Sequence, residues 1–292
     1  MSVVRAVTEV AGPELTSLRS PRVKAARQLA KRAMRERARS FLAEGPQAVS
    51  EALGHGGVVT QLFMTAAARA RHPGLAGQAS QQGAEVNTVS GEVMAELAQT
   101  ITPQGVLAVC RFVDVPLAML AGAAPRLAVI LANVRDPGNA GTVLRTADAA
   151  GAKGVVFSAA SVDPYNSKCV RASAGSIFHL ALVLGGQVAD TVASLREAGL
   201  RVLAADGKSG RSLDDIEPRG LLGEPTAWLF GNEAWGLPAE LAALADDTVA
   251  VPIYGRAESL NLAAAAAVCL YASAGAQRNN AGGGCRAAPA TR

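Results

Sequence analysis

Short apolar runs alternate with helical segments along most of the chain, in two separate stretches. In the first stretch, runs rich in apolar and β-branched residues predict strands at residues 41–45, 58–65, 85–90 and 106–112. Helices are predicted between them at residues 46–53, in the Arg- and Ala-rich run after residue 65, and at 91–99. These elements predict a small α/β unit that ends near Phe112.

A second alternation begins at Leu127. Its strands are predicted at residues 127–134, 154–158, 181–184, 200–206, 227–231 and 247–254. Its helices are predicted at residues 140–151, 167–176, 188–199, 238–245 and 261–275. Strands that alternate with helices favour a mainly parallel sheet covered on both faces, so the fold class is α/β.

These patterns divide the chain into five parts. They are an N-terminal tail (1–16), a small α/β domain (17–113), a linker rich in proline and small residues (114–125), a second α/β domain (126–276) and a C-terminal tail (277–292). The last segment is rich in Gly, Ala and Arg without an apolar period, and it is expected to be disordered.

The composition favours a soluble, cytoplasmic protein. Half of the residues are hydrophobic and 18% are charged. No window approaches the roughly 18 apolar residues of a membrane span, and the N-terminus lacks the basic and apolar regions of a signal peptide. The four cysteines are scattered without metal-binding spacing, so we expect reduced thiols and no metal site.

The net charge of +4 is unevenly distributed. Nine Lys or Arg and one acid lie between Arg19 and Arg39, so this segment carries +8 and the remainder −4. The segment predicts a basic helix that begins at Pro21 with Ser20 as its cap. It is either a solvated surface helix or a contact for a polyanion, because clustered basic residues supply the phosphate-directed part of nucleic-acid binding.

Three loops of the second domain contain residues too specific for ordinary turns, and each loop follows an apolar strand. They are DPGNAGTVLR (136–145), LFGNEAWGLP (229–238) and VPIYGRAESLNL (251–262). None carries a dinucleotide or P-loop glycine pattern. Loops at the carboxyl ends of parallel strands share one edge of the sheet, so these three are expected to form one ligand site.

In this order, the three loops resemble the signature motifs of the SpoU family of RNA ribose 2′-O-methyltransferases, within the SPOUT superfamily. The resemblance covers essentially the whole chain, because the basic segment and FLAEGPQAVSEAL are similar to the start of the family's small RNA-substrate-binding domain. It implies an α/β catalytic domain with a deep C-terminal trefoil knot, S-adenosyl-L-methionine as cofactor in the knot, and a homodimer through the catalytic domains.

The resemblance also implies the site residues. Those that match the motifs and are expected to be catalytic are Asn139, Arg145, Glu233, Ser259 and Asn261. Those expected at the cofactor are Leu229, Gly231, Asn232, Ile253, Ser259 and Leu260. Those expected at RNA are Lys24, Arg27, Lys31 and Arg171, the last near either the RNA or the dimer partner. Trp235 stands where many members carry a small residue, and it either shapes the cofactor rim or packs at the dimer contact.

Methyl transfer to a hydroxyl depends mainly on positioning, and the resemblance implies how these residues supply it. Arg145 engages the ribose hydroxyl and the neighbouring phosphate, as a polarising group or as an unusual base. Asn139 orients Arg145 or the phosphate, and Glu233 with Asn261 holds the loops and Arg145 in place. Taken alone, Asn139 and Ser259 could also be helix N-caps.

The sequence therefore predicts an S-adenosylmethionine-dependent RNA ribose 2′-O-methyltransferase. The favoured substrate is 23S ribosomal RNA, for housekeeping or for thiopeptide resistance, and transfer RNA is the alternative. A non-catalytic RNA-binding assembly factor on the same fold is the other class. That class predicts loss of the motif residues, yet the four decisive ones are intact: Asn139, Arg145, Glu233 and Asn261.

Overall fold

The computed structural model describes residues 13–282, which form two units divided between Phe112 and Val113. Most of the two predicted tails, residues 1–12 and 283–292, lies outside the described residues. Within the described part, no helix combines the length and the apolarity needed to cross a bilayer.

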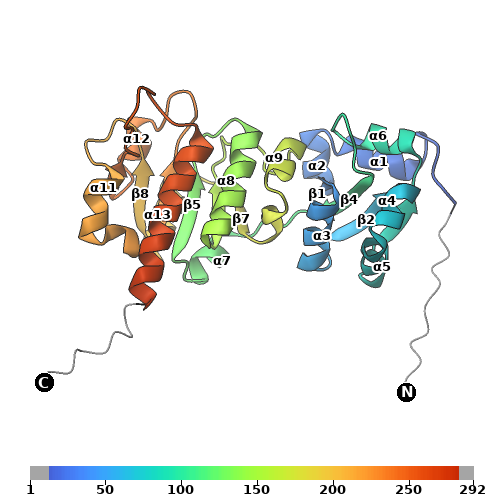
Figure 1. Cartoon of the computed structure of the whole chain (residues 1–292), viewed down its shortest axis with the longest axis horizontal. Helices are drawn as coiled ribbons and strands as arrows, with labels where there is room; N and C mark the ends of the chain where they lie inside the picture. Colours follow the sequence, from blue (N-terminus) through green and yellow to red (C-terminus); the bar gives the residue numbers. More distant parts are fainter. Residues whose placement is uncertain (1–12, 283–292) are drawn as a thin grey trace, which may run out of the picture. The chain divides into compact units, whose positions relative to one another are not determined.

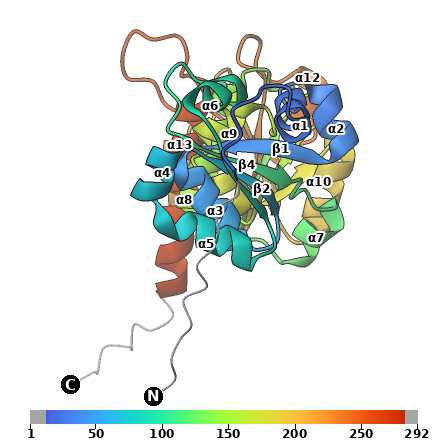
Figure 2. The ribbon, with the colours of Figure 1, turned by 90° about the vertical axis from the view of Figure 1, so that its right-hand side faces the viewer.

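The first unit is an α/β domain built on a four-stranded sheet (Figure 2). Its elements are α1 (Pro21–Gln28), α2 (Arg32–Ala38), β1 (Ser40–Glu44), α3 (Pro46–His55), β2 (Val59–Met64), α4 (Ala66–Arg71), α5 (Pro73–Gln81), β3 (Glu85–Thr88), α6 (Gly91–Leu97) and β4 (Val106–Arg111). The strand order is β1-β4-β2-β3, in which β4 is antiparallel to β1 and β2, and β3 is parallel to β2. Apolar residues of α1 and α6 pack with strand residues such as Phe63 and Leu107 into one buried core.

The basic segment is two helices, and the prediction of a single helix from Pro21 is wrong. α1 ends at Gln28 and α2 begins at Arg32. The buried guanidinium of Arg35 donates to the carbonyl oxygens of Leu29 and Ala30, both at 2.9 Å. It thereby satisfies carbonyls that the end of α1 leaves open, so Arg35 is a structural residue of this segment.

The second unit contains a six-stranded sheet (Figure 1). Its helices and strands are α7 (Leu117–Gly122), β5 (Leu127–Leu131), α8 (Pro137–Ala150), β6 (Gly154–Phe157), α9 (Ser167–Ala172), β7 (Ala181–Leu184), α10 (Val188–Glu197), β8 (Arg201–Ala205), α11 (Leu213–Ile216), β9 (Thr226–Phe230), α12 (Ala239–Ala242), β10 (Asp247–Val249) and α13 (Leu262–Gly282). Three short 3-10 turns lie at Ser176–Phe178, Glu217–Arg219 and Leu221–Gly223. The order is β10-β8-β9-β5-β6-β7 with every neighbouring pair parallel, which confirms the predicted parallel sheet.

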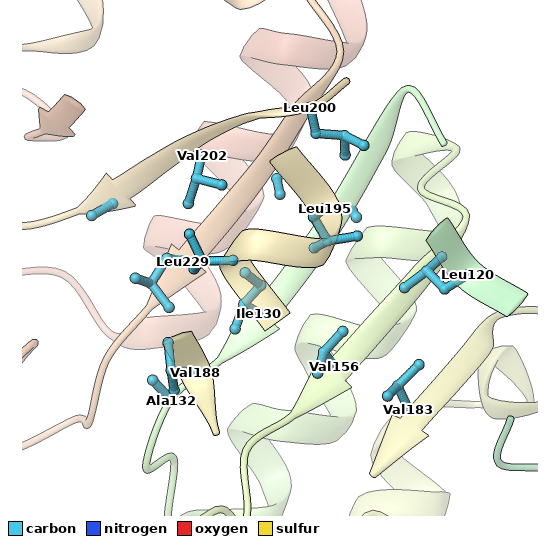
Figure 3. Close-up of a cluster of buried hydrophobic side chains, with 14 residues drawn as sticks. Leu120, Ile130, Ala132, Val156, Val183, Val188, Leu195, Leu200, Val202 and Leu229 are labelled. Carbon is cyan, nitrogen blue, oxygen red and sulfur yellow. The ribbon is translucent and has the colours of Figure 1, made fainter. Parts of the chain in front are cut away.

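Helices cover both faces of this sheet. On one face, α7 and α10 bury side chains such as Leu120 and Leu195 against Ile130, Val156 and Leu229 of the strands (Figure 3). On the other face, α8 and α13 pack against each other and against β5 (Figure 1). A sheet buried on both faces accounts for the nearly continuous apolar strands of the sequence.

Several boundaries differ from the predictions. α13 continues to Gly282, so the tail expected from residue 277 begins as helix. Its end is anchored because the Gln277 amide donates to the carbonyls of Arg126 (2.9 Å) and Glu224 (2.8 Å). At the other terminus, Leu15 of the expected tail pairs with Val89. The strand predicted to reach residue 254 ends at residue 249. The trefoil knot stays a prediction.

Candidate active site at the ends of β5, β9 and β10

The three loops follow β5, β9 and β10, and two of these strands are neighbours. Leu131 of β5 pairs with Phe230 of β9, while β6 and β7 extend the sheet on one side and β8 and β10 on the other. In open parallel sheets, ligands bind at the carboxyl ends of strands where the order of the chain switches direction. The loops after β5 and β9 lie at such a point.

The first loop leads directly into α8, and Asp136 caps this helix. Its Oδ1 accepts from the backbone N–H of Asn139 (2.8 Å), and Pro137 occupies the first helical turn. The Lys168 ammonium donates to Asp136 Oδ2 (2.7 Å), and this bond, followed by the backbone bond from Asn139, lowers the pKa of Asp136. The cap is therefore Asp136, and Asn139 keeps its side chain for other contacts.

Glu233 joins the second loop to the start of α8. Its Oε1 accepts from the backbone N–H of Asp136 (3.0 Å) and from Asn139 Nδ2 (3.3 Å). Its Oε2 accepts from the backbone N–H of Arg135 (3.1 Å). A carboxylate accepts several such bonds at once because both oxygens are acceptors, so Glu233 fixes the backbone and the Asn139 amide together.

Asn261 brings the third loop into the same network. Its Nδ2 donates to Asn139 Oδ1 (3.0 Å), while its Oδ1 accepts from the backbone N–H of Ala263 in the first turn of α13. Asn261 is therefore the N-cap residue of α13, and the N-cap role considered for Ser259 is wrong. The predicted residues Asn139, Glu233 and Asn261 form one hydrogen-bonded cluster.

Arg145 lies outside this cluster. It is exposed on α8, and it lines neither of the two cavities described below. Six residues of an α-helix rotate the side-chain direction by about 240°, so Arg145 points to a different side of α8 from Asn139. Within a single chain, the structure does not bring it to the other predicted catalytic residues.

A cavity of about 370 Å³ lies beside the cluster, between the second and third loops and the end of β8. Five of the residues predicted at the cofactor line it: Gly231, Asn232, Ile253, Ser259 and Leu260. Leu229 does not, because it is fully buried in the core under α10 (Figure 3). Sequence reasoning missed Asp206 and Lys208, which also line the cavity, although the strand LRVLAAD places them at the same edge of the sheet.

The cavity depends on a tight turn of the second loop. The backbone N–H and C=O groups of Asn232 and Gly236 bond reciprocally at 3.0 and 2.9 Å. A Cβ on Gly231 would lie 2.4 Å from the Gly236 carbonyl oxygen, which real Cβ atoms do not tolerate. The Asn232 amide also donates to the carbonyl of Asn133 after β5 (2.8 Å). The loop is thus held closed and tied to the neighbouring strand.

An open groove of about 570 Å³ adjoins the same loop on its other side. Its lining residues are Arg135, Asp136, Asn139, Asn232, Glu233, Ala234, Trp235 and Asn261. The hydrogen-bonded cluster therefore forms the wall of this groove, and four consecutive loop residues, 232–235, line both hollows.

None of the predicted RNA-binding residues belongs to the lining of the cavity or of the groove. Lys24 and Arg27 are exposed on α1, Lys31 precedes α2, and Arg171 is half-buried on α9. Arg27 pairs with Glu96 at 3.0 Å. Among the residues that the structure describes, no group of three or more His, Cys, Asp or Glu side chains could hold a metal ion.

Comparison with known proteins identifies both units. Residues 126–271 match the SpoU rRNA Methylase family, and residues 20–108 match the MRM3-like substrate binding domain. The chain is 32% identical over 258 residues to the 23S rRNA (guanosine(2553)-2′-O)-methyltransferase RlmP of Bacillus subtilis, covering 88% of this chain and 98% of that one. It is 36% identical over 164 residues to the tRNA (guanosine(18)-2′-O)-methyltransferase of Thermus thermophilus, covering 54% of this chain and 78% of that one.

The fold is similar to that of a solved structure with bound cofactor. The AdoMet-bound rRNA methyltransferase of Sinorhizobium meliloti superposes with a TM-score of 0.79 at 34% identity, covering 89% of this chain and 97% of that one.

Proposed function

The chain belongs to the SpoU rRNA Methylase family, and we propose that it transfers a methyl group from S-adenosyl-L-methionine to a ribose 2′-OH of RNA. The observation that carries the proposal is the bonding of Asn139 to both Glu233 and Asn261, between the cavity and the groove. One hollow can hold the methyl donor and the other the acceptor, with the loop at residues 232–235 between them.

The cavity beside β8 fits the cofactor in size and in chemistry. Its volume of about 370 Å³ lies within the ordinary range for small-molecule sites, roughly 300–1,000 Å³. Val249, Ile253 and Leu260 offer apolar surface, while the carboxylates of Asp206 and Glu258 can meet the cationic amino and sulfonium groups. Gly231 and Asn232 offer backbone groups. Bound there, S-adenosylmethionine supplies the reactive methyl group.

The residues of the cluster would orient the acceptor. Glu233 and Asn261 hold the Asn139 side chain, and Arg135 adds positive charge to the groove. Arg145 is assigned to the ribose hydroxyl and the adjacent phosphate. Because a guanidinium stays protonated in proteins, Arg145 would polarise the hydroxyl by its positive charge, and the hydroxyl proton would leave to water as the methyl group is transferred. In the alternative, the phosphate first takes a proton from Arg145, and the neutral guanidine then accepts the hydroxyl proton.

We infer that two copies are needed to complete this arrangement. Arg145 lines neither the cavity nor the groove of its own chain. On the neighbouring helix, Val268 and Tyr271 of α13 are 43% and 55% exposed, although both are large and hydrophobic. An exposed apolar strip on α13 beside α8 favours a homodimer through the catalytic unit. Mixing Arg145→Ala and Glu233→Gln chains tests this, since activity recovers only if one copy's Arg145 serves the other copy's site.

The favoured substrate is 23S ribosomal RNA. It is supported by the relative that matches along most of both chains, which is a 23S rRNA methyltransferase, and by the match of residues 20–108 to a substrate-binding domain. The relative that acts on tRNA matches only 54% of this chain. The exposed basic residues of α1 provide phosphate contacts. Housekeeping and thiopeptide-resistance methylation are both compatible with such a substrate, and either places the protein in the cytoplasm.

A transfer assay with labelled cofactor tests the proposal. The purified protein is incubated with S-adenosylmethionine carrying a tritiated methyl group and with 23S rRNA or tRNA transcripts. Methylation of the 2′-OH blocks attack of that oxygen on the phosphate, so the label must stay in alkali-resistant dinucleotides. Label released as mononucleotides would indicate base methylation, and absence of label in RNA would refute the proposal.

A further inference from the structure

Trp235 is a large exposed aromatic residue at the boundary of the two hollows. It is 57% exposed, whereas the other tryptophan, Trp228, is fully buried and donates to Ser273 Oγ (2.9 Å). Trp235 lines both the cavity and the groove. An exposed indole at this boundary can contact a ligand in either hollow.

The backbone beneath Trp235 is held in place. The reciprocal bonds between Asn232 and Gly236 enclose residues 233–235 in a tight turn. Asn232 is 5% exposed, and its Oδ1 accepts from the backbone N–H of Ala234 (2.8 Å). Glu233, the preceding neighbour, is tied to the start of α8. The indole is thus presented from a fixed turn, and a ligand that stacks on it need not order the loop first.

The groove lacks any other aromatic surface. Apart from Trp235, its lining consists of charged side chains, three asparagines and one alanine. The cofactor cavity, by contrast, has apolar walls of its own, formed by Val249, Ile253 and Leu260. A planar ligand in the groove can therefore stack on Trp235, whereas the other lining side chains offer it hydrogen-bonding groups and the small methyl group of Ala234.

We propose that Trp235 is a stacking platform for an unstacked base of the substrate RNA, at or next to the methylated nucleotide. The proposal rests on the proposed function, since it takes the groove as the acceptor side. To bring its ribose up to the methyl donor in the adjoining cavity, the target nucleotide must leave the regular helix, and single-stranded bases are commonly held on aromatic faces. Every base has such a face, so Trp235 contributes affinity for RNA without selecting among the four bases.

The test separates RNA binding from cofactor binding. Stacking on an aromatic side chain contributes about 1–3 kcal/mol per base, so Trp235→Ala should weaken the binding of a 23S rRNA transcript by about 5- to 150-fold. Trp235→Phe should recover most of that affinity, and Trp235→Leu should recover less because it offers area without a ring. The Kd for S-adenosylmethionine, the melting temperature and the size on gel filtration should stay as in the wild type.

Fluorescence supplies a direct signature. With the cofactor product S-adenosylhomocysteine bound, adding the transcript should quench the emission of the wild type, and the quenching should be absent in Trp235→Phe, in which Trp228 is the remaining tryptophan. Unchanged RNA affinity in Trp235→Ala would overturn the proposal. So would a loss that falls on cofactor affinity or on dimerisation. Methyl transfer by the wild type is measured in parallel. A wild type that transfers no methyl group would contradict the proposed function. An active wild type whose RNA affinity does not depend on Trp235 would contradict only this inference.

Discussion

Replacing Glu233 by glutamine probes the contact that joins the loops. The side chain keeps its shape, but only one of its two terminal atoms can still accept a hydrogen bond. With the amide oxygen in place of Oε1, the bonds from Asp136 and Asn139 persist, and the amide nitrogen faces the Arg135 N–H, which is itself a donor. At least one charge-assisted bond is lost and two are weakened.

The size of the effect follows from these bonds. A hydrogen bond to a charged group contributes about 1.5–3 kcal/mol, and the exposure of Glu233 places the loss near or below the lower end. We expect a loss of about 1–2 kcal/mol in transition-state binding, which is a 5- to 30-fold fall in kcat/KM. The transfer assay on the 23S rRNA transcript measures it. The matched control is Glu197→Gln, an exposed carboxylate on α10 outside both hollows, which removes the same charge.

A double-mutant cycle makes the test specific. Asn139→Ala removes the amide that donates to Glu233. The free-energy loss in the double variant should therefore be smaller than the sum of the losses in the two single variants. If Glu233→Gln stays within twofold of the wild type, or if the two effects are additive, Glu233 does not act by holding Asn139.

Three further changes test other parts of the site. Gly231→Ala forces a methyl group against the Gly236 carbonyl, so the turn must shift. Calorimetry should then report at least tenfold weaker binding of S-adenosylmethionine. An affinity equal to that of the wild type would show that the turn accommodates the methyl group. Arg145→Ala should leave that affinity near native but remove most methyl transfer, and near-native turnover would refute its catalytic role. The pKa of Asp136 is lowered in the folded protein, so the cap that this carboxylate provides stabilises α8 fully at pH values above the ordinary pKa of aspartate. This stabilisation is lost as the pH falls through the lowered pKa. Lys168→Met should raise that pKa, and acid unfolding followed by circular dichroism should then begin at a higher pH than in the wild type.

The parallel sheet could be predicted because its evidence is local. Strand residues such as 127–131 and 227–230 form uninterrupted apolar runs, and the alternation of such runs with helices implies buried parallel strands. The break in the basic helix could not be predicted in this way. At the break, the buried side chain of Arg35 donates to carbonyl oxygens at the end of α1. In the sequence, nothing distinguishes Arg35 from the exposed basic residues around it.

The site was predictable in part for the same reason. Asn139, Glu233 and Asn261 stand in three loops that a parallel sheet must bring to one edge, and the structure joins them by hydrogen bonds. Arg145 was grouped with them by its motif, yet helical rotation turns it away from Asn139 within one chain. Leu229 was placed at the cofactor because it adjoins Gly231, but it lies within a strand and its side chain faces the core.

Ribose-methylation mapping of 23S rRNA and tRNA, in cells with and without the gene, tests the central claim most directly. The account predicts a 2′-O-methylated nucleotide in 23S rRNA that disappears with the gene, returns with the wild-type gene, and does not return with the Arg145→Ala variant. Identical rRNA and tRNA maps in the two strains would contradict it.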